Sequence, residues 1–312
     1  MKQKKISVLV PCYNEEENVE PLCAAIREQL LSLPAYDYEI VFIDNFSADS
    51  TREKLTALCA GDPKVKAIFN ARNFGQFNSP FYGYLQTSGD CVISMCADFQ
   101  DPPEMIPKLV AEWEKGAKIV CAIKTTSKEN HFIRALRTIY YKLIKKMSEV
   151  EQIEHFTGFG LYDRSFIEVL KGLDDPAPFL RGIVAELGFR RVCIPYEQAK
   201  RRAGKTSNNF SRLYDAAMLS FTTYTKTPVR FMTFFGIFLA ALGFLGGIAV
   251  GVTAGVGVLE EFMPFVLLCV TVFLFGMGFF FLGMLGEYLL TVKTKVTHRP
   301  LVVEEKRINF DK

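Results

Sequence analysis

Two long stretches near the end of the chain contain no charged residue. Residues 231–259 are 29 such residues in a row, and residues 262–286 are 25 more. About 20 apolar residues in a helix span the hydrocarbon core of a bilayer, so the sequence predicts two transmembrane helices, 231–259 and 262–286. The alternative is a pair of buried helices in a soluble core, but soluble helices of this length rarely lack charges altogether.

The charges around these stretches predict their orientation. Glu260 and Glu261 stand alone in the short loop between them. Positive charges lie only on the outer sides, at Lys226, Arg230, Lys293, Lys295 and Arg299. By the positive-inside rule both termini and the soluble domain are expected in the cytoplasm, with the protein in the cytoplasmic (inner) membrane as a multi-pass protein.

Glycines recur every four residues along the first stretch, at Gly243, Gly247, Gly251 and Gly255. This spacing places them on one helical face and lets another helix approach closely. The partner is either the second stretch of the same chain or another copy in a homo-oligomer, and the pattern does not choose between them.

The overall charge excludes one class of function. The chain has 37 Lys and Arg against 34 Asp and Glu, a net charge of +3. Nucleic-acid binding needs a basic surface that neutralises several phosphates, so no nucleic-acid partner is expected. The eight cysteines form no Cys-x-x-Cys pair. We expect them to be reduced and mostly buried, as in a domain that faces the cytosol.

The first 207 residues alternate between short β-branched runs and amphipathic stretches. Strands are predicted at 6–10, 38–43, 65–69, 91–97 and 118–123, and helices at 16–32, 50–60, 76–88 and 102–115. This alternation predicts an α/β fold with a mostly parallel sheet and helices on both faces. The expected order is therefore a soluble domain (1–207), an interfacial amphipathic helix (208–230), the two-helix anchor (231–286) and a cytoplasmic tail (287–312).

Polar residues interrupt the strand runs where a parallel sheet binds its ligands. Residues 11–15 follow the first strand, Asp44 ends the second, and residues 98–100 follow the fourth. The chain has no Gly-x-Gly-x-x-Gly turn and no P-loop, which disfavours the usual dinucleotide and NTPase folds. Few basic residues lie at these ends, so a nucleotide's phosphates would need a metal, and an oxygen ligand such as Asp98 suits Mg²⁺ or Mn²⁺.

The acidic residues at 98–104 have two expected roles. Asp101 is interpreted as a helix N-cap, followed by Pro102 as the first helical residue and Glu104 as its capping-box partner. Asp98 and Gln100 precede the helix and are favoured as ligand-binding residues.

Taken in order, these motifs resemble those of the family 2 inverting glycosyltransferases with a GT-A fold. The resemblance rests on residues 8–15, 42–44, 72–75, 89–90, 97–104, 158–164, 181–182, 201–206, 286–290 and 299–300. Within that family the chain resembles the polyprenyl-phosphate glycosyltransferases, the group of dolichyl-phosphate mannose synthase and the bactoprenol glucosyltransferases. The resemblance covers nearly the whole chain.

The resemblance implies a role for each matching residue. Nucleotide-binding residues would be Pro11, Tyr13, Glu15 and, against the base, Asp44. A divalent metal, Mg²⁺ or Mn²⁺, would be held by Asp98 and Gln100, with Asp98 catalytic. Arg201, also catalytic, would meet the acceptor phosphate together with Lys205. Further phosphate candidates are Arg134 and Arg137, although arginines on a solvated helix face are the more frequent case. Arg201 and Arg202 could equally be a basic cluster attracted to anionic lipid.

The chain departs from the family pattern at three places. Cys96 replaces the first carboxylate of the Asp-x-Asp motif, and Asn45 replaces the second Asp of Asp-Asp-Gly-Ser. Residues 157–161 contain no carboxylate where the family's proposed base is expected. We interpret Cys96 as a residue that does not bind the metal, and Asp163, the nearest acid in sequence, as a helix N-cap.

A missing base favours one kind of acceptor. A phosphate monoester is largely a dianion at cytosolic pH, so it needs no deprotonation, whereas a sugar hydroxyl does. The Gln-x-x-Arg-Trp signature of processive synthases is also absent, since Trp113 is the single tryptophan. The sequence therefore predicts an enzyme that moves a sugar from a nucleotide-sugar to an undecaprenyl-type polyprenyl phosphate, with inversion, for cell-envelope glycans. The alternative is a catalytically lapsed relative that serves as a membrane scaffold or a nucleotide-sugar-binding subunit.

Overall fold

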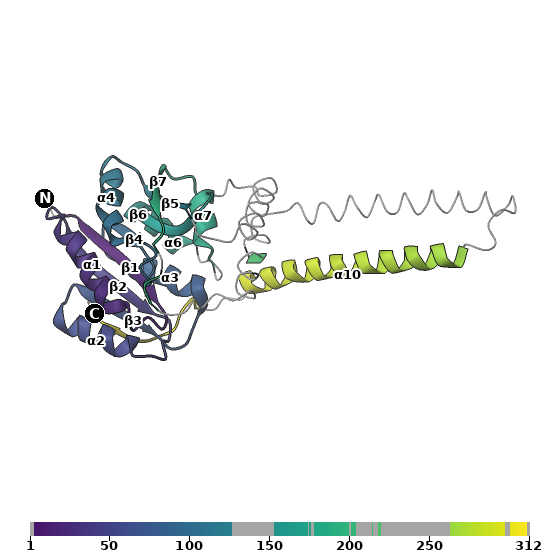
Figure 1. The fold of residues 1–312 in the computed structure, drawn as a ribbon, viewed down its shortest axis with the longest axis horizontal. Coiled ribbons are helices and arrows are strands. Elements are labelled where there is room, and N and C mark those ends of the chain that lie inside the picture. The colour runs from purple at the N-terminus through teal and green to yellow at the C-terminus, as the bar shows by residue number, and fades with distance from the viewer. Residues whose placement is uncertain are drawn as a thin grey trace.

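The structure is a computed structural model that describes residues 3–126, 153–173, 175, 178–199, 201–203, 214, 218–219, 263–296 and 300–310. These residues form an α/β domain and one long helix, α10, that extends away from it (Figure 1). Several expectations fall outside the described residues. They are Arg134, Arg137, Lys205, the first apolar stretch with its glycines, and all but three residues of the predicted interfacial helix.

The described strands form one eight-stranded sheet in the order β7-β5-β6-β4-β1-β2-β3-β8. Their bounds are β1 Lys5–Cys12, β2 Asp37–Asp44, β3 Val65–Asn70, β4 Cys91–Ser94, β5 Ile119–Thr126, β6 Phe156–Asp163, β7 Arg191–Glu197 and β8 Glu304–Ile308. Strands β4, β1, β2 and β3 are parallel neighbours, as are β5 and β7, whereas β6 and β8 run antiparallel to the strands beside them. The predicted α/β fold with a mostly parallel sheet is confirmed.

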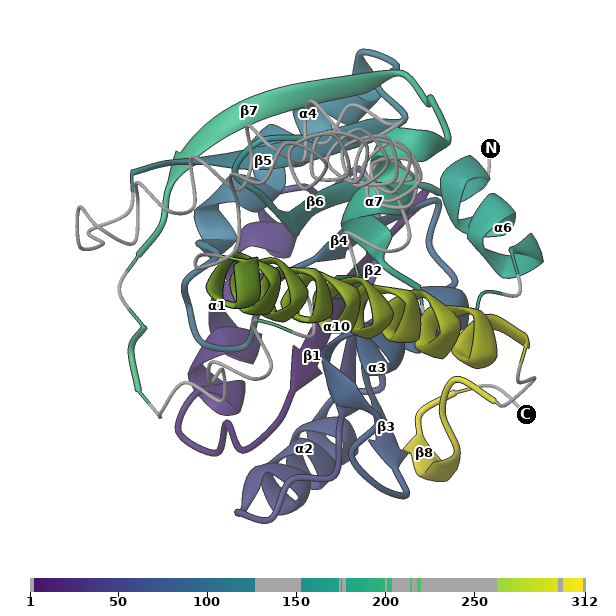
Figure 2. The same ribbon diagram turned by 90° about the vertical axis from the view of Figure 1, so that its right-hand side faces the viewer.

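Helices cover both faces of the sheet, as predicted (Figure 2). One core packs against α1 (Val19–Leu31), α2 (Thr51–Gly61) and α4 (Ile106–Glu114), and the other against α3 (Gly75–Gln86), α6 (Arg164–Gly172) and α7 (Leu180–Glu186). Strand β1 shows why the sequence folds this way. Ile6, Val8 and Val10 enter the first core and Leu9 the second, all fully buried. A strand covered on both faces needs a continuous apolar run rather than an alternating one.

The fourth strand is shorter than predicted. It ends at Ser94 instead of continuing to Ala97. The reason is that the Cys96 N–H donates to Asp101 Oδ2 at 2.9 Å and not to a carbonyl of a neighbouring strand. The predicted capping role of Asp101 is wrong for the same reason. A short 3-10 helix, η1 (Pro103–Met105), starts after Pro102 with no side-chain cap, and α4 follows it. Asp101 instead fixes the loop between β4 and η1.

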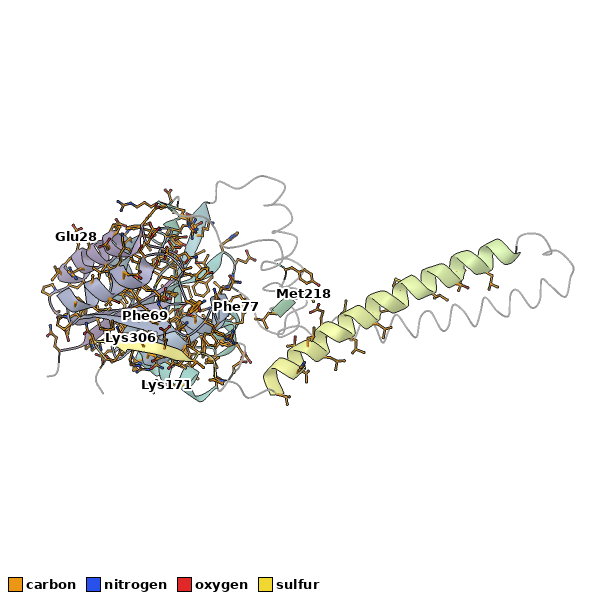
Figure 3. The ribbon with its side chains drawn as sticks, turned by 90° about the horizontal axis from the view of Figure 1, so that it is seen from below. Glu28, Phe69, Phe77, Lys171, Met218 and Lys306 are labelled. Carbon is orange, nitrogen blue, oxygen red and sulfur yellow. The ribbon has the colours of Figure 1, made fainter. Side chains whose placement is uncertain are left out.

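The last residues of the chain belong to the sheet rather than to a separate tail. Strand β8 pairs antiparallel with β3, and Phe69 lies opposite Lys306 (Figure 3). Just beyond β8, the Asn309 side-chain amide donates to the carbonyls of Cys59, Asp62 and Val65 at 2.7, 3.3 and 2.8 Å. Residues 304–308, which were expected in the tail, therefore form a strand of the sheet.

Helix α10 (Met263–Val296) contains most of the second apolar stretch of the sequence. Among the helices of the described residues, none combines the length and apolarity needed to cross a membrane. The predicted two-helix anchor is thus not confirmed by the structure.

Candidate active site

Loops at the carboxyl ends of three adjacent strands meet at one edge of the sheet. One residue after each strand has a positive φ that non-glycine residues rarely adopt: Asn14 (55°) after β1, Phe46 (69°) after β2 and Phe99 (62°) after β4. Such backbone conformations cluster at functional sites, where the surrounding structure holds them in place. The predicted ligand-binding edge of the sheet therefore carries the features of a site.

An arginine joins two carboxylates at this edge. Arg201 donates from Nε to Asp98 Oδ2 at 3.0 Å and from Nη2 to Glu15 Oε1 at 3.2 Å. Its Nη2 also lies 3.0 Å from Asp98 Oδ2, as an ion pair. The two carboxylate side chains are 8% and 10% exposed and the arginine is 25% exposed. Arg201 is 103 residues from Asp98 and 186 residues from Glu15 in the sequence, and its guanidinium group contacts both.

The second oxygen of each carboxylate is held locally. Asp98 Oδ1 accepts from the backbone N–H of Gln100 at 3.1 Å, and Glu15 Oε2 accepts from the side chain of Asn18 at 2.6 Å. Burial raises the pKa of Glu15, while the Asn18 hydrogen bond and the Arg201 charge lower it. Gln100 was predicted as a metal ligand; in the structure its backbone N–H contacts Asp98, and metal binding by Gln100 stays a prediction.

Asp44, the predicted base-binding residue, is fully buried. Its carboxylate accepts from the backbone N–H of Ser47 at 3.1 Å and from the Ser47 hydroxyl, and Arg52 Nε lies 3.4 Å from Oδ2. Burial raises the pKa of Asp44. In this conformation Asp44 supports the loop after β2, and its contact with a base stays a prediction. Pro11 and Tyr13 lie half-buried at the end of β1, and their contact with a nucleotide stays a prediction.

Asn45, one of the departures from the family pattern, organises the neighbouring loop. Its amide donates to Asn73 Oδ1 at 3.0 Å and to the Gly75 carbonyl at 3.2 Å. Its carbonyl oxygen accepts from the Phe74 N–H at 2.9 Å and from Asn70 Nδ2 at 3.1 Å. An aspartate could not make the two donations, so the asparagine is matched to this loop.

Cys96 and Asp101 flank Asp98 in the loop that follows β4. Asp101 is 3% exposed, and it accepts from the Tyr196 hydroxyl at 3.0 Å as well as from the Cys96 N–H. Cys96 is exposed rather than packed in a buried strand, which corrects the expected location of its side chain. The negative charge of Asp101 raises the pKa of the Cys96 thiol. Of the other described cysteines, Cys193 is also exposed and five are buried, and all seven are free.

Strand β6 contains no carboxylate next to the site. It runs antiparallel to β4, with Gly160 opposite Ser94 at the site edge and Asp163 opposite Cys91 at the other end. Three residues of strand separate these positions by roughly 10 Å. Asp163 caps α6 as predicted, since its side chain accepts from the Ser165 N–H at 3.0 Å. Its place in the sheet excludes it as a base for this site.

Three contributors to the site were not predicted from the sequence: Asn18, Tyr196 and the supporting role of Asn45. Asn45 was visible as a departure from a motif, which is a signal that could have indicated its importance. Nothing in the sequence connects Tyr196 to Asp101, because 95 residues separate them. Such pairings depend on the strand order alone.

Comparison with known proteins supports an enzymatic role. Residues 7–170 match the glycosyl transferase family 2. The SfII prophage-derived bactoprenol glucosyl transferase of Shigella flexneri is 34% identical over 97% of this chain and 98% of its own length. A prophage bactoprenol glucosyl transferase homolog of Escherichia coli is 32% identical over 95% of this chain and 97% of its own length.

Among solved structures, a glucosyl-3-phosphoglycerate synthase from Mycobacterium tuberculosis, in complex with Mn²⁺, UDP and phosphoglyceric acid, has a TM-score of 0.48. It is 18% identical, and the match covers 70% of this chain and 77% of that one. From the family match and the full-length relatives, the chain belongs to glycosyl transferase family 2 and is a glycosyltransferase.

Proposed function

We propose that the protein transfers a sugar from a nucleotide-sugar to a polyprenyl phosphate of the undecaprenyl type, with inversion at the anomeric carbon. The observation that carries this proposal is the near-full-length similarity to bactoprenol glucosyl transferases. The glycans concerned would be those of the cell envelope.

The chemistry of the site fits a phosphate acceptor. In an inverting transfer, an acceptor oxygen attacks the anomeric carbon while the nucleoside diphosphate leaves from the opposite face. A phosphate monoester, with a second pKa near 6, is already ionised for this attack. A site whose strand β6 offers no carboxylate would therefore serve a phosphate better than a hydroxyl. Arg201 is the described cation best suited to pair with that phosphate, because a guanidinium binds phosphate oxygens in a fork.

The same residues suit a divalent cation. Glu15 and Asp98 present hard oxygen donors on either side of one nitrogen atom, which is the donor type that Mg²⁺ and Mn²⁺ prefer. Within the described residues no group of three His, Cys, Asp or Glu side chains could hold a metal. Mg²⁺ is commonly bound by one or two carboxylates plus substrate phosphates. The phosphates of the nucleotide-sugar would therefore supply the remaining ligands of the cation. When bound, the cation would stabilise the charge that develops on the leaving diphosphate.

We also propose that the chain is anchored in the cytoplasmic membrane with its catalytic domain in the cytoplasm. The two uncharged stretches and the flanking positive charges support this location. So does the topology: residues 201–203 contact Asp98 and Asn18, and β8 pairs with β3 of the same domain. A chain that leaves this domain and returns to it crosses a bilayer an even number of times, as two spans require.

Turnover separates this function from a lapsed scaffold. We expect the purified full-length chain to release nucleoside diphosphate only when a suitable nucleotide-sugar and undecaprenyl phosphate are both present. A panel of donors would identify the sugar. A chain that binds nucleotide-sugars and turns none over with this acceptor would support the scaffold alternative.

Asp98→Asn should abolish transfer while the fold is retained, and EDTA should inhibit the wild type, because both remove cation binding at the diphosphate. Asp37→Asn is the matched control, since Asp37 lies at the amino end of β2, away from the carboxyl ends that carry the site. Activity and circular dichroism of both variants are the measurements. Near-normal turnover of Asp98→Asn, or no effect of EDTA, would contradict the metal assignment.

A further inference from the structure

We propose that Arg201 holds the place of the divalent cation between Glu15 and Asp98 in the donor-free enzyme. The arriving metal–donor complex would displace it, and the freed guanidinium would then bind the acceptor phosphate. This inference rests on the proposed function. It predicts that the acceptor site is assembled only after the donor is bound.

The contacts of Arg201 are those of a counter-ion. Nη2 alone contacts both carboxylates, Asp98 at 3.0 Å and Glu15 at 3.2 Å. The other oxygen of each carboxylate accepts a hydrogen bond from Gln100 or Asn18. Any cation that binds Glu15 and Asp98 together must therefore compete with Arg201 for the same oxygens.

The arrangement leaves polar atoms unused. Among the described residues, four buried side-chain atoms have no hydrogen-bond partner, and two of them belong to this cluster: Arg201 Nη1 and Asn18 Oδ1. Buried polar atoms are nearly always paired in folded proteins, and an unpaired one requires an explanation such as an absent ion or ligand. One orphaned donor and one orphaned acceptor in a single cluster indicate that the site is complete only with a further group.

The charges are also unbalanced. Two carboxylates carry two negative charges, and Arg201 supplies one positive charge, so the three groups retain one net negative charge. A divalent cation would balance both carboxylates and leave Arg201 without a local partner. A phosphate is the kind of partner that would then satisfy its planar set of donors.

Within the described residues, the ion pair of Arg201 is the shortest polar contact that residues 201–203 make. The other polar contacts that the structure describes for residues 201–203 are longer: the Arg202 N–H donates to the Asp98 carbonyl at 3.3 Å, and Asn18 Nδ2 donates to the Ala203 carbonyl at 3.4 Å. The Arg202 side chain stacks over the Phe99 ring at 5.1 Å. Displacing Arg201 from the carboxylates therefore costs few other strong hydrogen bonds.

The first experiment measures Mn²⁺ binding without donor, by electron paramagnetic resonance of free Mn²⁺, on the purified full-length chain. Arg201→Ala removes the guanidinium that competes with the metal. This variant should therefore bind Mn²⁺ at least about tenfold more tightly than wild type. Arg201→Lys keeps one charge but not the fork, so its affinity should lie between the two. Arg202→Ala is the matched control, since it removes an equal charge from the next residue, and its affinity should stay within about twofold of wild type.

Thermal unfolding gives a second readout that does not depend on activity. In EDTA, Arg201→Ala should melt below wild type, because two nearly buried carboxylates lose their counter-ion. Added Mn²⁺ should restore much of this loss in Arg201→Ala and change the wild type less. A variant that is merely misfolded would show neither the tighter Mn²⁺ binding nor the recovery.

Calorimetry with undecaprenyl phosphate tests the predicted order. Wild type should bind this lipid weakly alone and at least about tenfold more tightly with UDP and Mn²⁺ present, if UDP is the donor nucleotide. Equal or weaker Mn²⁺ binding by Arg201→Ala would overturn the inference and leave the proposed function intact. If wild type bound no Mn²⁺ even with nucleotide, the proposed metal itself would fail.

Discussion

At the scale of single residues, Cys96 is the departure that most affects how the site is interpreted. A thiol is a poor ligand for Mg²⁺ or Mn²⁺, which prefer hard oxygen donors. The neighbouring charge of Asp101 raises the pKa of this thiol, which keeps it protonated and disfavours metal binding further. Asp98 must therefore act without the first carboxylate of the motif, and Glu15 is the acid whose carboxylate shares Arg201 with it.

We expect Cys96→Ala to retain most transfer activity. The substitution leaves in place the backbone N–H at position 96, which donates a hydrogen bond to Asp101. The measurement is the rate of transfer with Mg²⁺ and with Mn²⁺. A large loss of activity in Cys96→Ala, together with stimulation of the wild type by a thiophilic metal such as Cd²⁺, would show that the thiol is a ligand after all.

At the scale of elements, Asp163 connects strand β6 and helix α6 to helix α4. It ends β6, caps α6, and accepts from Trp113 Nε1 at 2.7 Å and Lys118 Nζ at 3.0 Å. Burial alone would raise its pKa, but the hydrogen bonds from Ser165, Trp113 and Lys118 outweigh it and lower the pKa to about 2, from a usual 3.8. The acid nearest in sequence to the expected base is thus committed to structure.

This lowered pKa predicts how stability depends on pH. A carboxyl group whose pKa is lower in the folded state stabilises the fold above its unfolded pKa, and this contribution is lost as pH falls from about 4 through about 2. The contribution is roughly 2 kcal/mol. Asp163→Asn should lower the free energy of unfolding by about this amount at pH 7 and much less near pH 2, as measured by urea denaturation. A variant whose deficit stayed constant across this pH range would show that the Asp163 charge is not responsible.

At the scale of the whole molecule, the chain closes on itself. Strand β8 covers the outer edge of β3, and Arg52 links β2 to β8 by pairing with both Asp44 and Glu305, at 3.4 and 2.7 Å. The residues that follow α10 thus stabilise β3, which lies beside β2 and its predicted nucleotide-binding residue Asp44. Such an edge strand, if uncovered, leaves a row of backbone donors and acceptors unpaired.

Deleting residues 301–312 should therefore destabilise the catalytic domain rather than remove a passive tail. We expect a lower melting temperature and weaker nucleotide binding, measured by thermal unfolding and calorimetry. Asn309→Ala should lose part of the same stability, roughly 1–3 kcal/mol, because the hydrogen bonds from the Asn309 amide to three carbonyls are lost. Removing only residues 311–312 is the control. An unchanged melting temperature after the longer deletion would show that β8 contributes nothing to the domain.

The sequence by itself determined the features that depend on local pattern. Apolar runs at strand length, separated by amphipathic stretches, predicted β1, β2, β3 and β5 to within a few residues, because a strand buried on both faces must be continuously apolar. The cap at Asp163 was equally local, since an N-cap contacts residues within one turn. The family, and with it the enzyme class, followed from the order of the motifs.

Only the tertiary structure decided how distant residues pair. Asp101 looked like a cap because its neighbours in sequence suit one, but a longer-range bond to Tyr196 and the turn back to Cys96 took its carboxylate instead. The addition of β8 to β3 and the union of Glu15, Asp98 and Arg201 span more than 100 residues each. No periodicity encodes such contacts, because they arise from strand order and loop closure, which the whole fold sets at once.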